Sequence, residues 1–162
     1  MNDRWWPYDK VVFAGTFDHL HEGHKHLLRT ALSLGQHVAI GLTTQKLLEK
    51  KDLQDKMQSY QEREEALWEF LESEDQAGRC TIFPIETVEG GADRMEDLDA
   101  LIVSDEISVV RNAFRINDLR ARNDLKRFHI IVVPRVRTKD GRPLSSSRRR
   151  KGEKFEGVEL IY

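Results

Sequence analysis

The chain has 162 residues, 39% of them hydrophobic and 33% charged, which suits a single domain over residues 1–162. The formal net charge of -2 excludes a global basic field that would draw the protein to nucleic acid or to an anionic membrane. A lone cysteine, Cys80, excludes an internal disulfide and a zinc site built from paired cysteines. Because no apolar run approaches roughly 20 residues and no secretory signal opens the sequence, we expect a cytoplasmic protein in a reducing compartment.

The predicted elements alternate between strands and helices along the chain. Short apolar runs predict strands over 10–14, 37–42, 80–85, 98–103 and 127–133. Apolar residues at helical spacing predict helices over 22–34, 61–74 and 107–123, with a loop or short helix over 46–56. This alternation predicts an α/β fold, a Rossmann-like parallel five-stranded sheet with helices on both faces. The last residues, 158–162, are expected to dock on the body or on a partner.

Glycine and histidine residues gather directly after the first predicted strand. The segment from Gly15 to Asp18 is followed by His21, Gly23 and His24 at the opening of the first helix. Ligands of an open parallel sheet bind beyond the carboxyl ends of its strands, and a helix amino terminus suits phosphate. The two histidines are spaced so that both rings can face one ligand, with Gly23 leaving room for it. The segment predicts a phosphate site; a transition-metal site or plain surface histidines are the alternatives.

A serine- and arginine-rich segment, from Leu144 to Arg150, follows the last predicted strand. Serines before a helical turn act as N-caps and leave donors for an anion, and arginine supplies a bidentate phosphate donor. By itself the segment is equally typical of a capped basic helix or of a nucleic-acid-binding cluster.

Taken together, the two segments resemble the signatures of the nucleotidylyltransferase superfamily, G-T-F-D with H-x-G-H and I-S-S-T-x-I-R. The chain departs from the second signature at Leu144, Ser147 and Arg149, whereas Arg150 falls on the arginine of the signature.

Three further stretches resemble the phosphopantetheine adenylyltransferases of archaeal and eukaryotic type. These are residues 41–46, the K-x-x-x-Y-x-x-R pattern from Lys56 to Arg63, and residues 100–134. The resemblance spans about residues 10–153 and weakens over 87–97, where the Asp-Pro-x-Gly-Pro turn of the family is replaced by Val88 to Ala92.

The resemblance implies transfer of AMP from ATP to 4'-phosphopantetheine, with Mg²⁺ carried by the ATP and no metal site made by the protein. The implied catalytic residues are Thr16, His21, His24, Lys46 and Arg150. The implied ATP contacts are Gly15, Thr16, Phe17, His21, His24, Ser104, Glu106, Ser145, Ser146, Ser147 and Arg150. The implied phosphopantetheine contacts are Thr16, Lys46, Arg63, Asn117 and Arg120. For Arg63, Asn117 and Arg120, a purely structural role on a helix is an equal alternative.

Two rival functions remain open. One is an adenylyltransferase for another acceptor, such as nicotinamide mononucleotide or flavin mononucleotide. The other is a non-catalytic module that binds nucleic acid through residues 148–151, against which the acidic charge balance speaks. We therefore expect ATP and 4'-phosphopantetheine as partners, and neither nucleic acid nor a membrane. The sequence does not report an oligomeric state.

Overall fold

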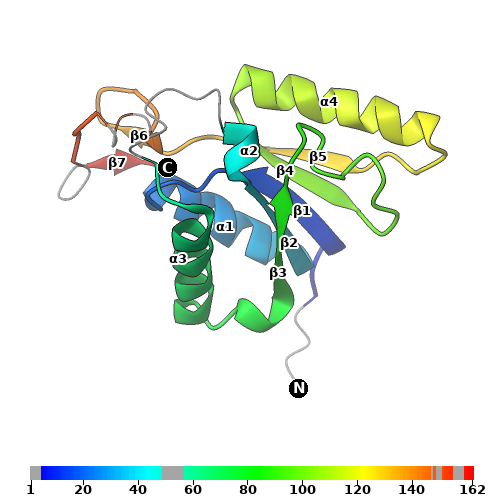
Figure 1. The fold of residues 1–162 in the computed structure, drawn as a ribbon, viewed down its shortest axis with the longest axis horizontal. Coiled ribbons are helices and arrows are strands. Elements are labelled where there is room, and N and C mark those ends of the chain that lie inside the picture. The colour runs from blue at the N-terminus through cyan, green and yellow to red at the C-terminus, as the bar shows by residue number, and fades with distance from the viewer. Residues whose placement is uncertain (1–4, 49–56, 147, 149–150, 155–158) are drawn as a thin grey trace.

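The chain folds around a parallel sheet of five strands in the order β3-β2-β1-β4-β5 (Figure 1). The computed structural model describes residues 5–48, 57–146, 148, 151–154 and 159–162. The strands of the sheet are β1 (Tyr8–Gly15), β2 (Gly35–Thr43), β3 (Cys80–Ile85), β4 (Ala100–Ser104) and β5 (His129–Val133). All four neighbouring pairs are parallel, which confirms the predicted Rossmann-like sheet.

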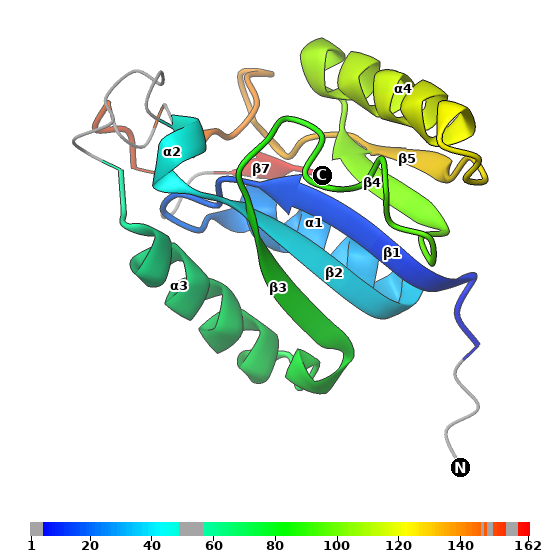
Figure 2. The same cartoon turned by 45° about the vertical axis from the view of Figure 1, so that its right-hand side comes forward.

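Helices cover both faces of this sheet, as predicted (Figures 1 and 2). The helical elements are α1 (Glu22–Leu34), α2 (Gln45–Leu48), α3 (Tyr60–Ser73), the 3-10 turn η2 (Ala77–Arg79) and α4 (Ile107–Arg122). On one face α1 and α3 pack side by side, and on the other face α4 lies over β4 and β5. The predicted loop or short helix over 46–56 includes most of α2, and its remainder lies outside the described residues.

Two apolar cores result from the alternation of side chains along the strands. In β1, Val11 and Phe13 pack under α1 and α3, whereas Val12 between them packs under α4. Each of these side chains is almost fully buried, which is worth roughly 1.5–3 kcal/mol apiece. A register shift of one residue would exchange the two faces, so the apolar pattern fixes how the strands pair.

The end of the chain returns to the body. A second, antiparallel sheet pairs β6 (Arg137–Thr138) with β7 (Leu160–Ile161), and the ring of Tyr162 contacts the edge of His26 with centroids 5.4 Å apart. The expected docking of the tail on the body is thus confirmed, although strands of two residues are too short to have been predicted from periodicity. Among the described helices, none combines the length and apolarity that a membrane crossing requires.

Candidate active site

The turn after β1 is shaped by Gly15 and Phe17. Phe17 has a positive φ of 52°, which folds the chain back so that its ring lies over the end of the strand. A Cβ atom on Gly15 would stand 3.1 Å from that ring, tighter than ordinary packing allows. Phe17 is buried and contacts the edges of Phe13 and His24. The absence of a side chain at Gly15 thus gives room to a ring of the protein itself.

His21 and His24 begin helix α1 by capping each other. Nδ1 of His21 accepts the N–H of Gly23 at 3.0 Å, and Nδ1 of His24 accepts the N–H of His21 at 3.2 Å. The two rings are stacked with centroids 3.8 Å apart. Because both Nδ1 atoms accept, each neutral ring carries its proton on Nε2, the atom through which an imidazole can donate to an anion. Nε2 of His21 is buried in this structure.

The role of Gly23 differs from the one expected from the sequence. A Cβ atom there would lie 2.8 Å from Cε1 of His21, so the space is filled by the capping imidazole and was not left for a ligand. The reason is that His21 is the N-cap residue, and its ring bends over the first turn of the helix.

The serine-rich segment reaches the histidine segment from the other end of the chain. Oγ of Ser146 donates to the carbonyl oxygen of Asp18 at 2.6 Å, and Leu144 lies beside Gly23. Oγ of Ser145 accepts the N–H of Arg148 at 3.2 Å, which is the predicted N-cap contact. The two segments therefore converge on the carboxyl edge of the sheet. Ser147, Arg149 and Arg150 lie outside the described residues.

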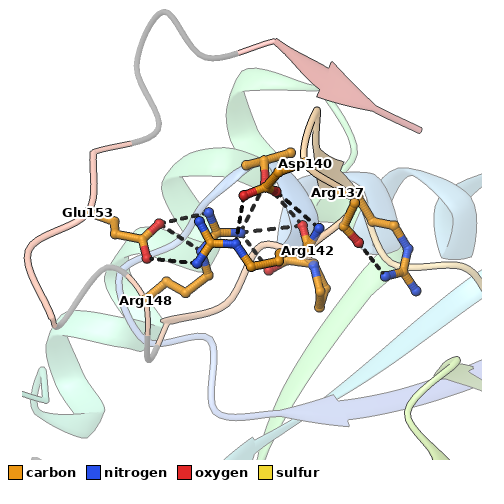
Figure 3. Close-up of polar contacts among 8 residues, drawn as sticks. Arg137, Asp140, Arg142, Arg148 and Glu153 are labelled. Atoms are coloured by element: carbon orange, nitrogen blue, oxygen red, sulfur yellow. Dashed lines mark hydrogen bonds and ion pairs between the residues drawn. The ribbon is translucent and has the colours of Figure 1, made fainter.

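A network of charged side chains holds the serine segment against β6 (Figure 3). Arg148 donates to Glu153 through Nε at 2.8 Å and Nη2 at 2.7 Å, and Arg142 also contacts that carboxylate at 3.6 Å. Hydrogen bonds from Thr138 and Arg142 hold the pKa of Asp140 well below its usual range. The cation of Arg148 is thus engaged with an acidic partner of the same chain, which does not favour a nucleic-acid surface at this residue.

Both segments line one cavity of about 960 Å³ at the carboxyl ends of the strands. The predicted ATP-binding residues that line it are Gly15, Thr16, Phe17, His21, His24, Ser104, Glu106, Ser145 and Ser146. The cavity continues between α4 and the segment that follows β3. Its apolar walls there include Phe83, Ile85, Ala92, Val109 and Ile116. One end is therefore polar and rich in hydrogen-bond donors, and the other combines these apolar walls with polar and charged side chains.

The four remaining predicted acceptor residues do not line the cavity. Lys46 lies on α2, next to Leu47, which does line it; the Lys46 side chain is exposed and forms no hydrogen bond or ion pair with the described residues. Arg63 is fully buried below the edge of the sheet. Asn117 and Arg120 lie at the far end of α4, near the start of β5, where both bind backbone groups.

Those two α4 residues have structural partners. Asn117 pairs through its amide with the backbone N–H and carbonyl of Phe128, both at 2.9 Å. Arg120 donates to the carbonyl oxygens of Ala92, Met95 and Lys126. These contacts correspond to the structural alternative stated for Asn117 and Arg120, and we do not carry the two residues into the proposed acceptor site.

Sequence reasoning missed part of the cavity wall. Residues 87–90 and the α4 side chains Arg111 and Asn112 line it, and Nδ2 of Asn112 donates to the carbonyl of Val88. Glu89 forms an ion pair with Arg115 at 2.8 Å, and this hydrogen bond lowers the pKa of Glu89. The available signal was the stripe of polar residues at positions 108, 112 and 115, which share one face of the predicted helix.

Known proteins are similar to this chain in sequence and in fold. The sequence model of the cytidylyltransferase-like family matches residues 12–152, so the chain belongs to that class of proteins. It is 39% identical over 150 residues to a phosphopantetheine adenylyltransferase of Methanopyrus kandleri, with 93% of each chain covered. The corresponding enzyme of Pyrococcus abyssi is 39% identical over 145 residues, with 90% of each chain covered.

Within that class, the chain belongs to the family of phosphopantetheine adenylyltransferases. This confirms the resemblance found in the sequence and makes the chain a nucleotidyltransferase. A crystal structure of an Archaeoglobus fulgidus protein of unknown function shares the fold with a TM-score of 0.64 and 26% identity, over 76% of this chain and 88% of that one.

Proposed function

We propose that the chain transfers the adenylyl group of ATP to 4'-phosphopantetheine. A phosphate oxygen of the acceptor attacks the α-phosphorus, the bond between the α-phosphorus and the α,β-bridging oxygen breaks, and pyrophosphate leaves as dephospho-coenzyme A forms. An ionised phosphate is already a nucleophile, so no base and no covalent intermediate are needed. Catalysis then consists of positioning the two substrates and neutralising the charge that develops between them.

One observation carries this proposal: the histidine and serine segments, more than 120 residues apart in the sequence, line the same cavity. In the proposed complex, His21 and His24 donate Nε2–H groups to the α- and β-phosphates, and the amino terminus of α1 adds its partial positive charge. Ser145 and Ser146, with Ser147 and Arg150 beyond the described residues, clamp the β- and γ-phosphates.

The nucleotide and the acceptor occupy different parts of the cavity in this proposal. Ser104 and Glu106 contact the nucleotide at the end of β4, with Gly15 and Phe17 opposite them. Thr16 and Lys46 orient the attacking phosphate. The apolar part of the cavity between α4 and residues 87–92 suits an acceptor whose phosphate is joined to a long, partly apolar arm.

Magnesium would enter with the triphosphate. Among the residues that the structure describes, no group of three His, Cys, Asp or Glu side chains is placed to hold a metal ion. The described residues therefore fit an ion that is bound mostly by ATP oxygens and water, which is the usual coordination of Mg²⁺. When bound, it would neutralise charge on the phosphates.

The test is to incubate the protein with ATP, Mg²⁺ and one acceptor at a time, and to follow pyrophosphate release. We expect release with 4'-phosphopantetheine and none with nicotinamide mononucleotide or flavin mononucleotide. His24→Asn is the matched control, because it keeps a side-chain acceptor for the helix cap and removes the imidazole donor. If pyrophosphate is released with one of the mononucleotides instead, that mononucleotide is the acceptor and 4'-phosphopantetheine is not. If no acceptor gives pyrophosphate release, the proposal is refuted.

A further inference from the structure

Arg63 connects the ends of two strands beneath the candidate active site. Its Nη1 donates to the carbonyl oxygens of Thr16 at 2.9 Å and Thr43 at 2.8 Å. Thr16 directly follows β1 and Thr43 is the last residue of β2, and the register pairs Gly15 with Leu42. The guanidinium therefore extends the link between the two strands one residue beyond their last paired position.

The position of Arg63 is fixed by the start of α3. Ser59 is the N-cap of a capping box: its Oγ accepts the backbone N–H of Glu62, and its own backbone N–H donates to Oε1 of Glu62. This places Arg63 in the first helical turn, with its Nε donating to the carbonyl of Gln58 at 3.2 Å and its cation near the ring of Tyr60. The planar guanidinium presents its N–H donors in directions that suit three carbonyls from three segments. A lysine ammonium cannot reproduce this arrangement of donors.

A buried carboxylate compensates the charge of Arg63. Asp18 is fully buried and accepts the N–H of Gln58 at 2.8 Å. Burial lowers the pKa of the Arg63 guanidinium, and the negative charge of Asp18 opposes that shift, so the cation is retained. Ser146 also binds the carbonyl of Asp18, so Asp18 links the surroundings of Arg63 to the serine segment.

The threonines that Arg63 holds face the substrates. Thr16 and Thr43 both line the cavity, and their hydroxyls are 3.2 Å apart. Nη2 of Arg63 lies 3.4 Å from Oε1 of Gln45, the first residue of the helix that carries Lys46. Arg63 itself does not line the cavity.

We propose that Arg63 is a positioning residue for adenylyl transfer: it fixes Thr16, Thr43 and the start of α2 against the phosphates and touches neither substrate. This inference rests on the proposed function. It replaces the direct contact with phosphopantetheine that the sequence resemblance implied for Arg63, since the side chain is fully buried, lines no part of the cavity and is held by carbonyl oxygens of Thr16 and Thr43.

The test compares Arg63→Lys with Arg79→Lys. Arg79 is a matched control because it donates to the carbonyls of Gly35 and Gln36 at the opposite end of the same strand, β2, and to that of Leu32 near the end of α1, and it lines no part of the cavity. Both variants should lower the melting temperature. Only Arg63→Lys should also lower kcat, by up to about 100-fold, because a small misplacement of groups around the reacting centre is enough for that loss.

Each variant is assayed well below its own melting temperature, and Arg63→Gln replaces Arg63→Lys if the latter does not fold. The inference would be overturned if a folded Arg63 variant kept the kcat and acceptor KM of the wild type, or if its loss of kcat were equal to that of Arg79→Lys. If the wild-type protein releases no pyrophosphate, the proposed function fails. The dissociation constant of ATP, measured by calorimetry, then decides about Arg63: a weakening confined to the Arg63 variant supports positioning, and equal affinities of all three proteins refute it.

Discussion

The two edges of the sheet use the same side chain for different purposes. At the carboxyl edge, Arg63 is fully buried and bound to the backbone carbonyls of Thr16, just after β1, and Thr43, the last residue of β2. At the amino edge, Arg120 is equally buried and also bound to three carbonyls, and Arg79 holds the start of β2. Arg63 and Arg120 resemble each other in burial and partners, so the difference proposed in their function comes from the edge on which each lies.

The asymmetry follows from parallel pairing. All five strands end at one edge, and α1 and α4 begin there, so exposed N–H groups and partial positive charge collect on that side. The amino edge receives the helix carboxyl ends instead. An arginine at the amino edge can stabilise the fold, whereas one at the carboxyl edge can also shape a phosphate site.

The largest effect is expected for His24→Ala at the carboxyl edge. The imidazole donor is proposed to strengthen its contact in the transition state, and loss of one such donor costs about 100- to 1,000-fold in kcat. The affinity for ATP should change far less. Equal losses in steady-state turnover and in calorimetric ATP binding would contradict this role. His129→Ala at the amino edge is the control and should retain turnover, since His129 contacts Tyr8 away from the cavity.

Lys46→Ala should have the next largest effect, about tenfold or more on kcat with 4'-phosphopantetheine as acceptor. The removed ammonium is exposed at the end of β2 and is proposed to orient the attacking phosphate. Lys126→Ala removes a cation at the amino edge that pairs with Asp99, and it should leave kcat unchanged. Unaltered turnover in the Lys46 variant would remove that residue from the site.

Arg120→Lys should lower the free energy of unfolding by about 2 kcal/mol, because buried carbonyls lose their donors. The kcat of the folded variant should remain within a few-fold of the wild-type value. Urea denaturation and turnover assays on the same preparation measure both quantities. A drop in kcat as large as that of Arg63→Lys would remove the functional distinction between the two edges.

The smallest effect is expected for Glu89→Gln at the cavity wall. The Glu89–Arg115 pair is partly exposed and is worth at most about 1 kcal/mol, so the acceptor KM should rise by no more than about fivefold. High salt should reduce the difference between wild type and variant.

Because of the Glu89–Arg115 pair, we also expect the acceptor KM to depend on pH. The pKa of Glu89 is lowered in the folded protein. The stabilisation by the Glu89–Arg115 ion pair is therefore complete above the ordinary pKa of a glutamate, and it is lost as the pH falls through the pKa that Glu89 has in the folded protein. In acid, the wild-type KM should therefore approach that of Glu89→Gln. A constant ratio of the two KM values down to that range would exclude the ion pair as the cause.

Much of the fold could be predicted because long apolar patterns carry it. The bounds of α1 and β3 match the predicted 22–34 and 80–85, and the histidine and serine segments both lie at the predicted edge. The sequence did not predict which polar residues on helices are buried within the protein and which line the cavity. Arg63 and Arg120 each lie on a helix, within a stretch that resembles the family. No local signal in the sequence distinguishes a buried arginine from one that contacts a ligand, because the carbonyls that bind the arginine come from distant segments.

By itself, the sequence determined the parallel α/β sheet and the family and predicted the two candidate phosphate-binding segments, since periodicity and short motifs are local properties of the chain. Only the tertiary structure decided that Gly15 and Gly23 make room for Phe17 and His21, and that β6 pairs with β7. It also decided that Arg63 lies under the site while Arg120 lies at the far edge. Close packing and the satisfaction of buried polar groups depend on which distant residues meet, and that is settled only when the chain has folded.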